Sequence, residues 1–216
     1  MRTSIIGFIL IVFCGIIIAY FMISDNKQLS IYNPVKIDEK LVDSELHSVM
    51  SGHRIGSFQL TNQYGNQLTE RDFEGYIYVA DFFFTTCPGI CKAMAKQMIR
   101  VQEANLEQSD FKILSHTVQP EVDSPAVLLE YATLYDADSN IWQFGTGDRM
   151  EIFRLARKSY FAATLEKGGD ENEMVHTENF VLIDKEKRIR GIYDGTSEDE
   201  VNKLIEDIEI LRNSYE

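Results

Sequence analysis

Cysteine is scarce in this sequence. Only Cys14, Cys87 and Cys91 occur among 216 residues. Cys14 lies inside a long apolar run near the start, so Cys87 and Cys91 are the two cysteines of the remaining chain. Two cysteines this close together cannot cross-link a fold of this size, which excludes a small disulfide-stapled scaffold.

Positive charge is also in short supply. The chain has 21 Lys and Arg against 34 Asp and Glu, a formal net charge of −13 at pH 7. A surface of this sign repels phosphate backbones, so we expect no nucleic-acid binding, whereas cations or a basic partner would be attracted. Internal repeats and low-complexity tracts are absent as well, so a repeat architecture is not expected.

One long apolar run is present. Residues 4–23 carry no charge, and about 20 such residues match the thickness of a bilayer core. We predict an uncleaved transmembrane anchor, because the run is longer than the apolar part of a usual signal peptide and no small-x-small cleavage site follows it. Arg2 is the only basic side chain before the run. Residues 1–3 are therefore expected to be a cytoplasmic stub, with the soluble part on the periplasmic side of the inner membrane.

The rest of the chain is long enough for one packed domain. Residues 24–52 are polar and are expected to form a tether. A β-hairpin is predicted around residues 63–66, where Gly65 can adopt a positive φ. The nearly continuous apolar run 76–84 then predicts a central strand that is buried on both faces.

Helices and strands alternate after this central strand. Pro88 suits a first helical turn, Ser124 and Pro125 form an N-cap and N1 pair, and both Asp148 and Ser197 have a Glu three residues later, as in a capping box. The order predicts a mixed α/β sheet with helices on both faces. The predicted elements are helix 88–107, strand 111–117, a helix opening at 124, strand 141–145, helix 148–160, strands 178–184 and 188–193, and a helix opening at 197.

The cysteine pair falls where the central strand gives way to the first helix. Cys87 would lie at the helix start, where unpaired N–H groups and the positive end of the helix dipole stabilise a thiolate. Cys91 follows four residues later on the same helical face, within reach of Cys87 for a disulfide or a shared ligand. The usual dithiol oxidoreductase motif has two residues between its cysteines, and this pair has three.

The residues leave two chemistries open. Two thiolates suit Cu(I), which accepts low coordination numbers, and the imidazole of His176 could complete a three-coordinate site. A structural zinc site would need four ligands, and no fourth is evident. In the other reading the pair is a redox-active dithiol, in which Cys87 attacks and Cys91 resolves. By pattern alone, His176 is a weak signal.

Three separated segments resemble the Sco/SenC family. They are FFFTTCPGIC at residues 82–91, PEVDSP at 120–125, and His176 ahead of the strand ENFVLID. The resemblance covers about residues 53–213. It implies a thioredoxin-like fold for this Sco domain. The transmembrane helix and the β-hairpin predicted above would come before the rest of the sheet.

Carried over by position, the resemblance implies that Cys87, Cys91 and His176 bind copper, as Cu(I) or Cu(II). It also implies that the two cysteines are able to form a disulfide in the metal-free state and that Asp123 is a nearby supporting acid. The implied function is copper delivery to the binuclear copper site of cytochrome c oxidase, with the copper-bearing subunit as a partner. A periplasmic copper donor or thiol reductant is a further expected partner. The alternative is a thiol-disulfide oxidoreductase acting on that site or on other exported proteins.

Overall fold

The computed structural model describes residues 28–38, 41–42, 44–165, 174–176 and 178–215, together with Phe13. For residues 163–165 and 174–176 it describes the backbone strands alone. The predicted anchor, residues 4–23, lies outside this part apart from Phe13. Among the described residues, no helix is long and apolar enough to cross a membrane.

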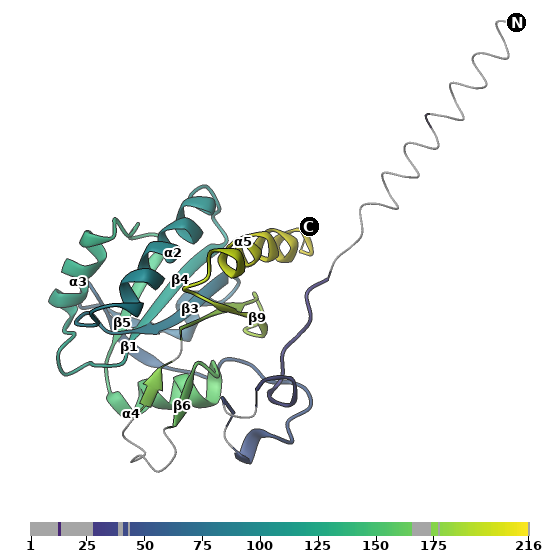
Figure 1. The fold of residues 1–216 in the computed structure, drawn as a ribbon, viewed down its shortest axis with the longest axis horizontal. Coiled ribbons are helices and arrows are strands. Elements are labelled where there is room, and N and C mark those ends of the chain that lie inside the picture. Colours follow the sequence, from purple (N-terminus) through teal and green to yellow (C-terminus); the bar gives the residue numbers. More distant parts are fainter. Residues whose placement is uncertain are drawn as a thin grey trace, which may run out of the picture.

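A seven-stranded sheet forms the centre of the domain (Figure 1). The strand order is β2-β1-β5-β4-β3-β8-β9. β3, β4 and β5 run parallel, whereas β8 is antiparallel to β3 and forms a hairpin with β9. This confirms the predicted mixed sheet. The strands are β1 Gln59–Asn62, β2 Gln67–Thr69, β3 Ile77–Phe83, β4 Phe111–Thr117, β5 Trp142–Thr146, β8 Asn179–Ile183 and β9 Ile189–Asp194.

β3 is the predicted central strand, and all seven of its residues are buried. Successive side chains of a strand point to opposite faces. Val79 and Phe83 accordingly join the hydrophobic cluster on one face, while Tyr78 and Phe82 join the cluster on the other. A strand buried on both faces has no polar side to alternate with, which explains its nearly continuous apolar sequence.

Helices cover both faces of the sheet (Figure 1). One face carries α2 (Ile90–Ala104), α3 (Pro125–Leu134) and α5 (Glu198–Asn213). The other carries α4 (Arg149–Arg154) and the π-helical segment that follows it, Leu155–Ser159. The helix predicted over 148–160 is therefore α-helical only in its first part.

The predicted local signals are largely present. The β1–β2 hairpin turns through Gly65, whose φ is +79°. The Ser124 hydroxyl accepts from the N–H of Val127, and the Ser197 hydroxyl accepts from the N–H of Glu200. Short-range patterns of this kind are readable because cap and turn residues contact only their sequence neighbours.

One pair of strands was not predicted. β6 (Ala163–Leu165) and β7 (Met174–His176) form a separate antiparallel ladder, with Ala163 opposite His176. Residues 166–173, which join the two strands, lie outside the described part. Strands of three residues are too short to show a period of two in the sequence.

The segment expected to be a tether contacts the domain in the part that is described. The N–H of Tyr32 donates to the carbonyl oxygen of Ile189 at 2.8 Å, which extends the β9 edge by one bridge. Ile37 and Val42 are buried in the cluster on the α4 face. The division into a tether at 24–52 and a domain at 53–213 stays a prediction.

Candidate dithiol site

Cys87 lies in the loop between β3 and α2, and Cys91 lies in the first turn of α2. The N–H of Cys91 approaches the Sγ of Cys87 at 3.5 Å. Both cysteines are free thiols, and both are buried, with 5% and 2% of their surface exposed. The fold therefore brings the two sulfur atoms to one protected place at the carboxyl end of β3.

The helix start changes the acidity of Cys87. Burial by itself would raise the pKa of this thiol, because desolvation disfavours the thiolate. The N–H groups of Cys91, Gly89 and Ile90 act in the opposite direction, and together they lower the pKa below its usual value. This is the effect predicted for a thiol at a helix N-terminus.

Cys91 shows the opposite shift. Burial is the main cause and raises its pKa to about 12, although a hydrogen bond with the Phe84 backbone partly opposes this. The sulfur of Cys87 and the carboxylate of Asp81 raise the pKa further, since each disfavours a second negative charge nearby. The site consequently pairs one thiol whose pKa is lowered with one whose pKa is raised.

Asp81 was missed by the sequence analysis. It lies in β3 on the same face of the sheet as α2, and it is 4% exposed. Its carboxylate accepts a hydrogen bond from the Ser115 hydroxyl at 2.5 Å, and the Ser115 oxygen accepts from Trp142 Nε1 at 2.8 Å. Burial raises the pKa of Asp81 to about 7. A lone acid within the apolar run 76–84 was the signal that could have found it.

Asp123 lies beside the loop that carries Cys87. Its side chain is completely buried. The carboxylate accepts from the backbone N–H of Thr85 at 3.2 Å, from the Thr85 hydroxyl at 2.5 Å, and from the Thr117 hydroxyl. The next residue, Thr86, donates to Gln119 Oε1 at 3.1 Å. The structure thus places Asp123 next to the loop that carries Cys87.

His176 occupies the last position of β7. Its side chain lies outside the described part of the structure, so its part in the site stays a prediction. Within the described residues, no three His, Cys, Asp or Glu side chains gather to hold a metal ion. Cys87 and Cys91 contribute two soft sulfur donors, a donor set that fits Cu(I).

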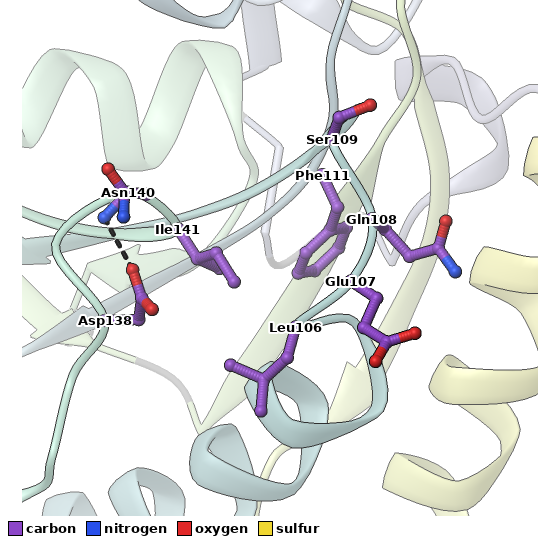
Figure 2. Close-up of a pocket in the computed structure, with 8 residues that line it drawn as sticks. All are labelled: Leu106, Glu107, Gln108, Ser109, Phe111, Asp138, Asn140 and Ile141. Atoms are coloured by element: carbon purple, nitrogen blue, oxygen red, sulfur yellow. Dashed lines mark hydrogen bonds between the residues drawn. The ribbon is translucent and has the colours of Figure 1, made fainter.

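One cavity, of about 270 Å³, lies far from the dithiol. Figure 2 shows Phe111 between Asp138 and Asn140 on one side and Glu107 and Gln108 on the other. The residues that line this cavity come from the loop after α2 and from the starts of β4 and β5. Cys87 follows the carboxyl end of β3, and β3 runs parallel to β4 and β5. The cavity at the amino ends of β4 and β5 therefore lies at the opposite end of these strands.

A second cavity, of about 250 Å³, lies where residues 28–32 meet β9 and α5. Arg190, in its wall, donates to the carbonyl oxygens of Leu29 and Ser30 and pairs with the buried Asp184 at 2.9 Å. Its polar groups hold the N-terminal segment in place. Neither cavity includes a cysteine.

Comparison with known proteins places this arrangement in a family. The family model described as SCO1/SenC matches residues 49–212. The SCO1 protein homolog of Bacillus subtilis is 30% identical over 158 residues, which cover 72% of this chain and 81% of that protein. The family resemblance of the sequence motifs is confirmed.

Solved structures agree with this match. BsSco, a member of the Sco family of cytochrome c oxidase assembly proteins in which a disulfide switch was identified, is 29% identical with a TM-score of 0.63. The match covers 74% of this chain and 93% of BsSco. Yeast Sco1 with copper bound is 27% identical with a TM-score of 0.56, covering 73% and 90%. The thioredoxin-like fold implied by the motifs is confirmed.

Proposed function

Because the chain belongs to the SCO1/SenC family, we propose that it binds copper through Cys87, Cys91 and His176 and delivers it to the binuclear copper site of cytochrome c oxidase. Two relatives support this role. Yeast Sco1 has been crystallised with copper bound, and BsSco belongs to a family of cytochrome c oxidase assembly proteins. The proposal includes the membrane anchor at residues 4–23 and a domain on the periplasmic side of the inner membrane.

The observation that carries the proposal is the buried pair of cysteines. Cys87 and Cys91 present two sulfur atoms in a site that is almost closed to water. Burial excludes hard ligands such as water and favours a soft ion with few ligands. Since the pKa of Cys91 is raised to about 12, this thiol must release its proton when copper binds. Copper affinity is therefore expected to rise with pH over the neutral range.

Redox state controls such a site. A disulfide between Cys87 and Cys91 removes both sulfur donors, so only the reduced pair holds Cu(I). The disulfide switch of BsSco is consistent with this control. In this proposal, a thiol reductant acts first and copper loading follows.

The test is a Cu(I) titration of the reduced full-length chain in detergent micelles, in competition with a Cu(I) chelator. One copper per chain is expected for the unaltered protein. Cys87→Ser and His176→Ala should each lower the affinity by at least tenfold, whereas Cys14→Ser, which removes the third thiol, should leave it unchanged. Unaltered affinity in His176→Ala would overturn the three-ligand site.

The opposite pKa shifts of the two cysteines favour a second function, thiol-disulfide exchange. The Cys87 thiolate would attack a partner disulfide and form a mixed disulfide, releasing one partner thiolate. Cys91 would then lose its proton and attack Cys87, releasing the second partner thiolate and leaving a Cys87–Cys91 disulfide. Two electrons pass to the partner.

His176→Ala separates the two functions. In a copper carrier this variant loses copper affinity, and in a reductase it keeps the rate of disulfide exchange. The exchange rate is measured with an exported protein that carries an oxidised copper-site cysteine pair, and Cys87→Ser serves as the inactive control.

A further inference from the structure

Thr85 is bound twice by one buried carboxylate. Its backbone N–H and its hydroxyl both donate to Asp123, at 3.2 and 2.5 Å. The neighbouring Thr86 is exposed, and within the described part of the chain its side chain makes one hydrogen bond, to Gln119. Two adjacent threonines therefore differ sharply in how firmly they are held.

The buried carboxylate fixes the conformation of the loop. Asp123 has no exposed surface, and a buried carboxylate is costly unless its oxygens accept hydrogen bonds. Among the described residues three groups donate to it, two from Thr85 and one from Thr117. Any loop conformation that turns Thr85 away leaves the carboxylate short of donors, so such conformations are disfavoured.

Thr85 lies two residues before Cys87, at the point where the chain leaves β3. The direction of the chain here decides where the Cys87 sulfur lies relative to the first turn of α2. We propose that Thr85 is a positioning residue, which uses its two bonds to Asp123 to hold the sulfur of Cys87 against the N–H of Cys91. This inference deepens the proposed function and rests on it for the copper measurement.

The variant that tests this is Thr85→Val, which keeps the shape of the side chain and removes the hydroxyl. Groups that orient a metal ligand without touching the metal commonly change metal affinity by about 10- to 100-fold. We expect Thr85→Val to lower Cu(I) affinity by about tenfold. Thr85→Ser, which restores a hydroxyl, should recover most of the affinity.

A second measurement needs no metal. When the Cys91 N–H no longer faces the Cys87 sulfur, the reduced form is less stabilised, and the dithiol–disulfide midpoint of Thr85→Val should move to a more negative potential. A tenfold change in the equilibrium constant corresponds to about 30 mV. Thr85→Ser should again lie near the unaltered protein.

Thr196→Val is the matched control. Thr196 also donates its N–H and its hydroxyl to one carboxylate, that of Asp194, but it lies in the loop between β9 and α5. Losing its hydroxyl should change the free energy of unfolding and leave both the copper affinity and the midpoint potential unchanged. A shift in Thr196→Val as large as that in Thr85→Val would overturn the positioning role.

The outcomes distinguish the two proposals. If the unaltered protein does not bind Cu(I), the proposed function fails, and the midpoint potential still decides the role of Thr85. If Thr85→Val is folded by urea unfolding and neither measurement moves, the positioning role is wrong. Should Thr85→Val fail to fold, Asp123→Asn replaces it, since one amide oxygen cannot accept all three donors, and the same two measurements decide.

Discussion

The two faces of the sheet treat a buried titratable side chain in different ways. On the dithiol face, Asp81 is linked through Ser115 to Trp142 and acts electrostatically on Cys91. On the α4 face, His116 stacks on Phe82 with ring centroids 4.5 Å apart. Asp81 and Phe82 are consecutive in β3, so the alternation of the strand alone separates these environments.

Burial shifts these two groups in opposite directions. It disfavours the charged form of each, so the pKa of Asp81 rises to about 7, while that of His116 falls to about 4. The Nδ1–H of His116 donates to the Asp81 carbonyl oxygen at 3.2 Å, and its Nε2 has no hydrogen-bond partner among the described residues. The acid belongs to a polar network beside the site, and the imidazole is a neutral ring in an aromatic cluster.

The opposite pKa shifts make the stability of the fold depend on pH in opposite ways on the two faces. The folded pKa of Asp81 is above its unfolded value of 3.8, so its contribution to stability is complete below pH 4 and is lost as pH rises through 7. The folded pKa of His116 is below its unfolded value of 6.5, so its contribution is lost as pH falls from 6.5 through 4. Between pH 4 and 7 the pH-dependent contributions of Asp81 and His116 to stability therefore offset each other.

Removing the acid should have the largest effect. Asp81→Asn keeps an acceptor for the Ser115 hydroxyl and removes the cost of a buried charge. We expect the variant to be more stable than the unaltered protein at pH 8, by up to about 4 kcal/mol, with no gain at pH 4. Urea unfolding of the reduced protein at pH 4, 6 and 8 measures this. A difference that does not vary with pH would contradict the raised pKa.

Removing the imidazole should change how the free energy of unfolding depends on pH in the opposite direction. His116→Phe keeps an aromatic ring on Phe82 and cannot be protonated. Relative to the unaltered protein, it should gain about 3 kcal/mol between pH 7 and 4, because the penalty of charging the buried ring is gone. Tyr160→Phe is the control, since its ring lies 5.1 Å from that of His116 and has no group that titrates in this range. The idea fails if both variants show the same pH slope.

Breaking the polar network on the dithiol face should lower stability by a smaller amount, and this loss should not depend on the α4 face. Ser115→Ala removes the hydroxyl that donates to the Asp81 carboxylate and that accepts from Trp142 Nε1. Unpaired buried polar groups of this kind destabilise a fold by about 1–3 kcal/mol. Thermal and urea unfolding measure the loss, with the exposed Ser109→Ala expected to stay within about 0.5 kcal/mol. Equal effects would show that the network contributes nothing.

The smallest change in stability is expected for an ion pair between α4 and the loop that joins β4 to α3. Glu121 and Arg149 form an ion pair at 3.3 Å, and their side chains are 57% and 42% exposed. Pairs this exposed contribute below about 1 kcal/mol and are screened by salt. Glu121→Gln should therefore change the free energy of unfolding only slightly, and the change should vanish in 1 M salt. A larger loss would show that the two faces are coupled through this loop.

The elements that the sequence predicted well are those set by local patterns. The central strand, the β1–β2 hairpin and the capped starts of α3 and α5 were all identified from residues within one turn or one strand. Cys87 was placed at a helix start for the same reason, and its lowered pKa follows from it. Three-residue strands and the π-helical segment left no such pattern.

The partners of the candidate site could not be predicted in the same way. Asp123 was singled out by a family motif, yet its link to Thr85 joins residues 38 positions apart in sequence. Asp81 and Ser115 are 34 positions apart and meet only because β3 and β4 are paired in register. No local pattern encodes a register between distant strands.

By itself, the sequence determined the alternation of strands and helices, the family, and the place of the Cys87–Cys91 pair at the start of a helix. The tertiary structure decided how far burial raises the pKa of Cys91, which carboxylate fixes the loop, and which buried group lies on which face. The physical reason is the sequence separation over which each interaction acts. Periodicity, caps and turns depend on neighbours in the chain, whereas burial and hydrogen bonds between strands depend on which distant segments the fold packs together.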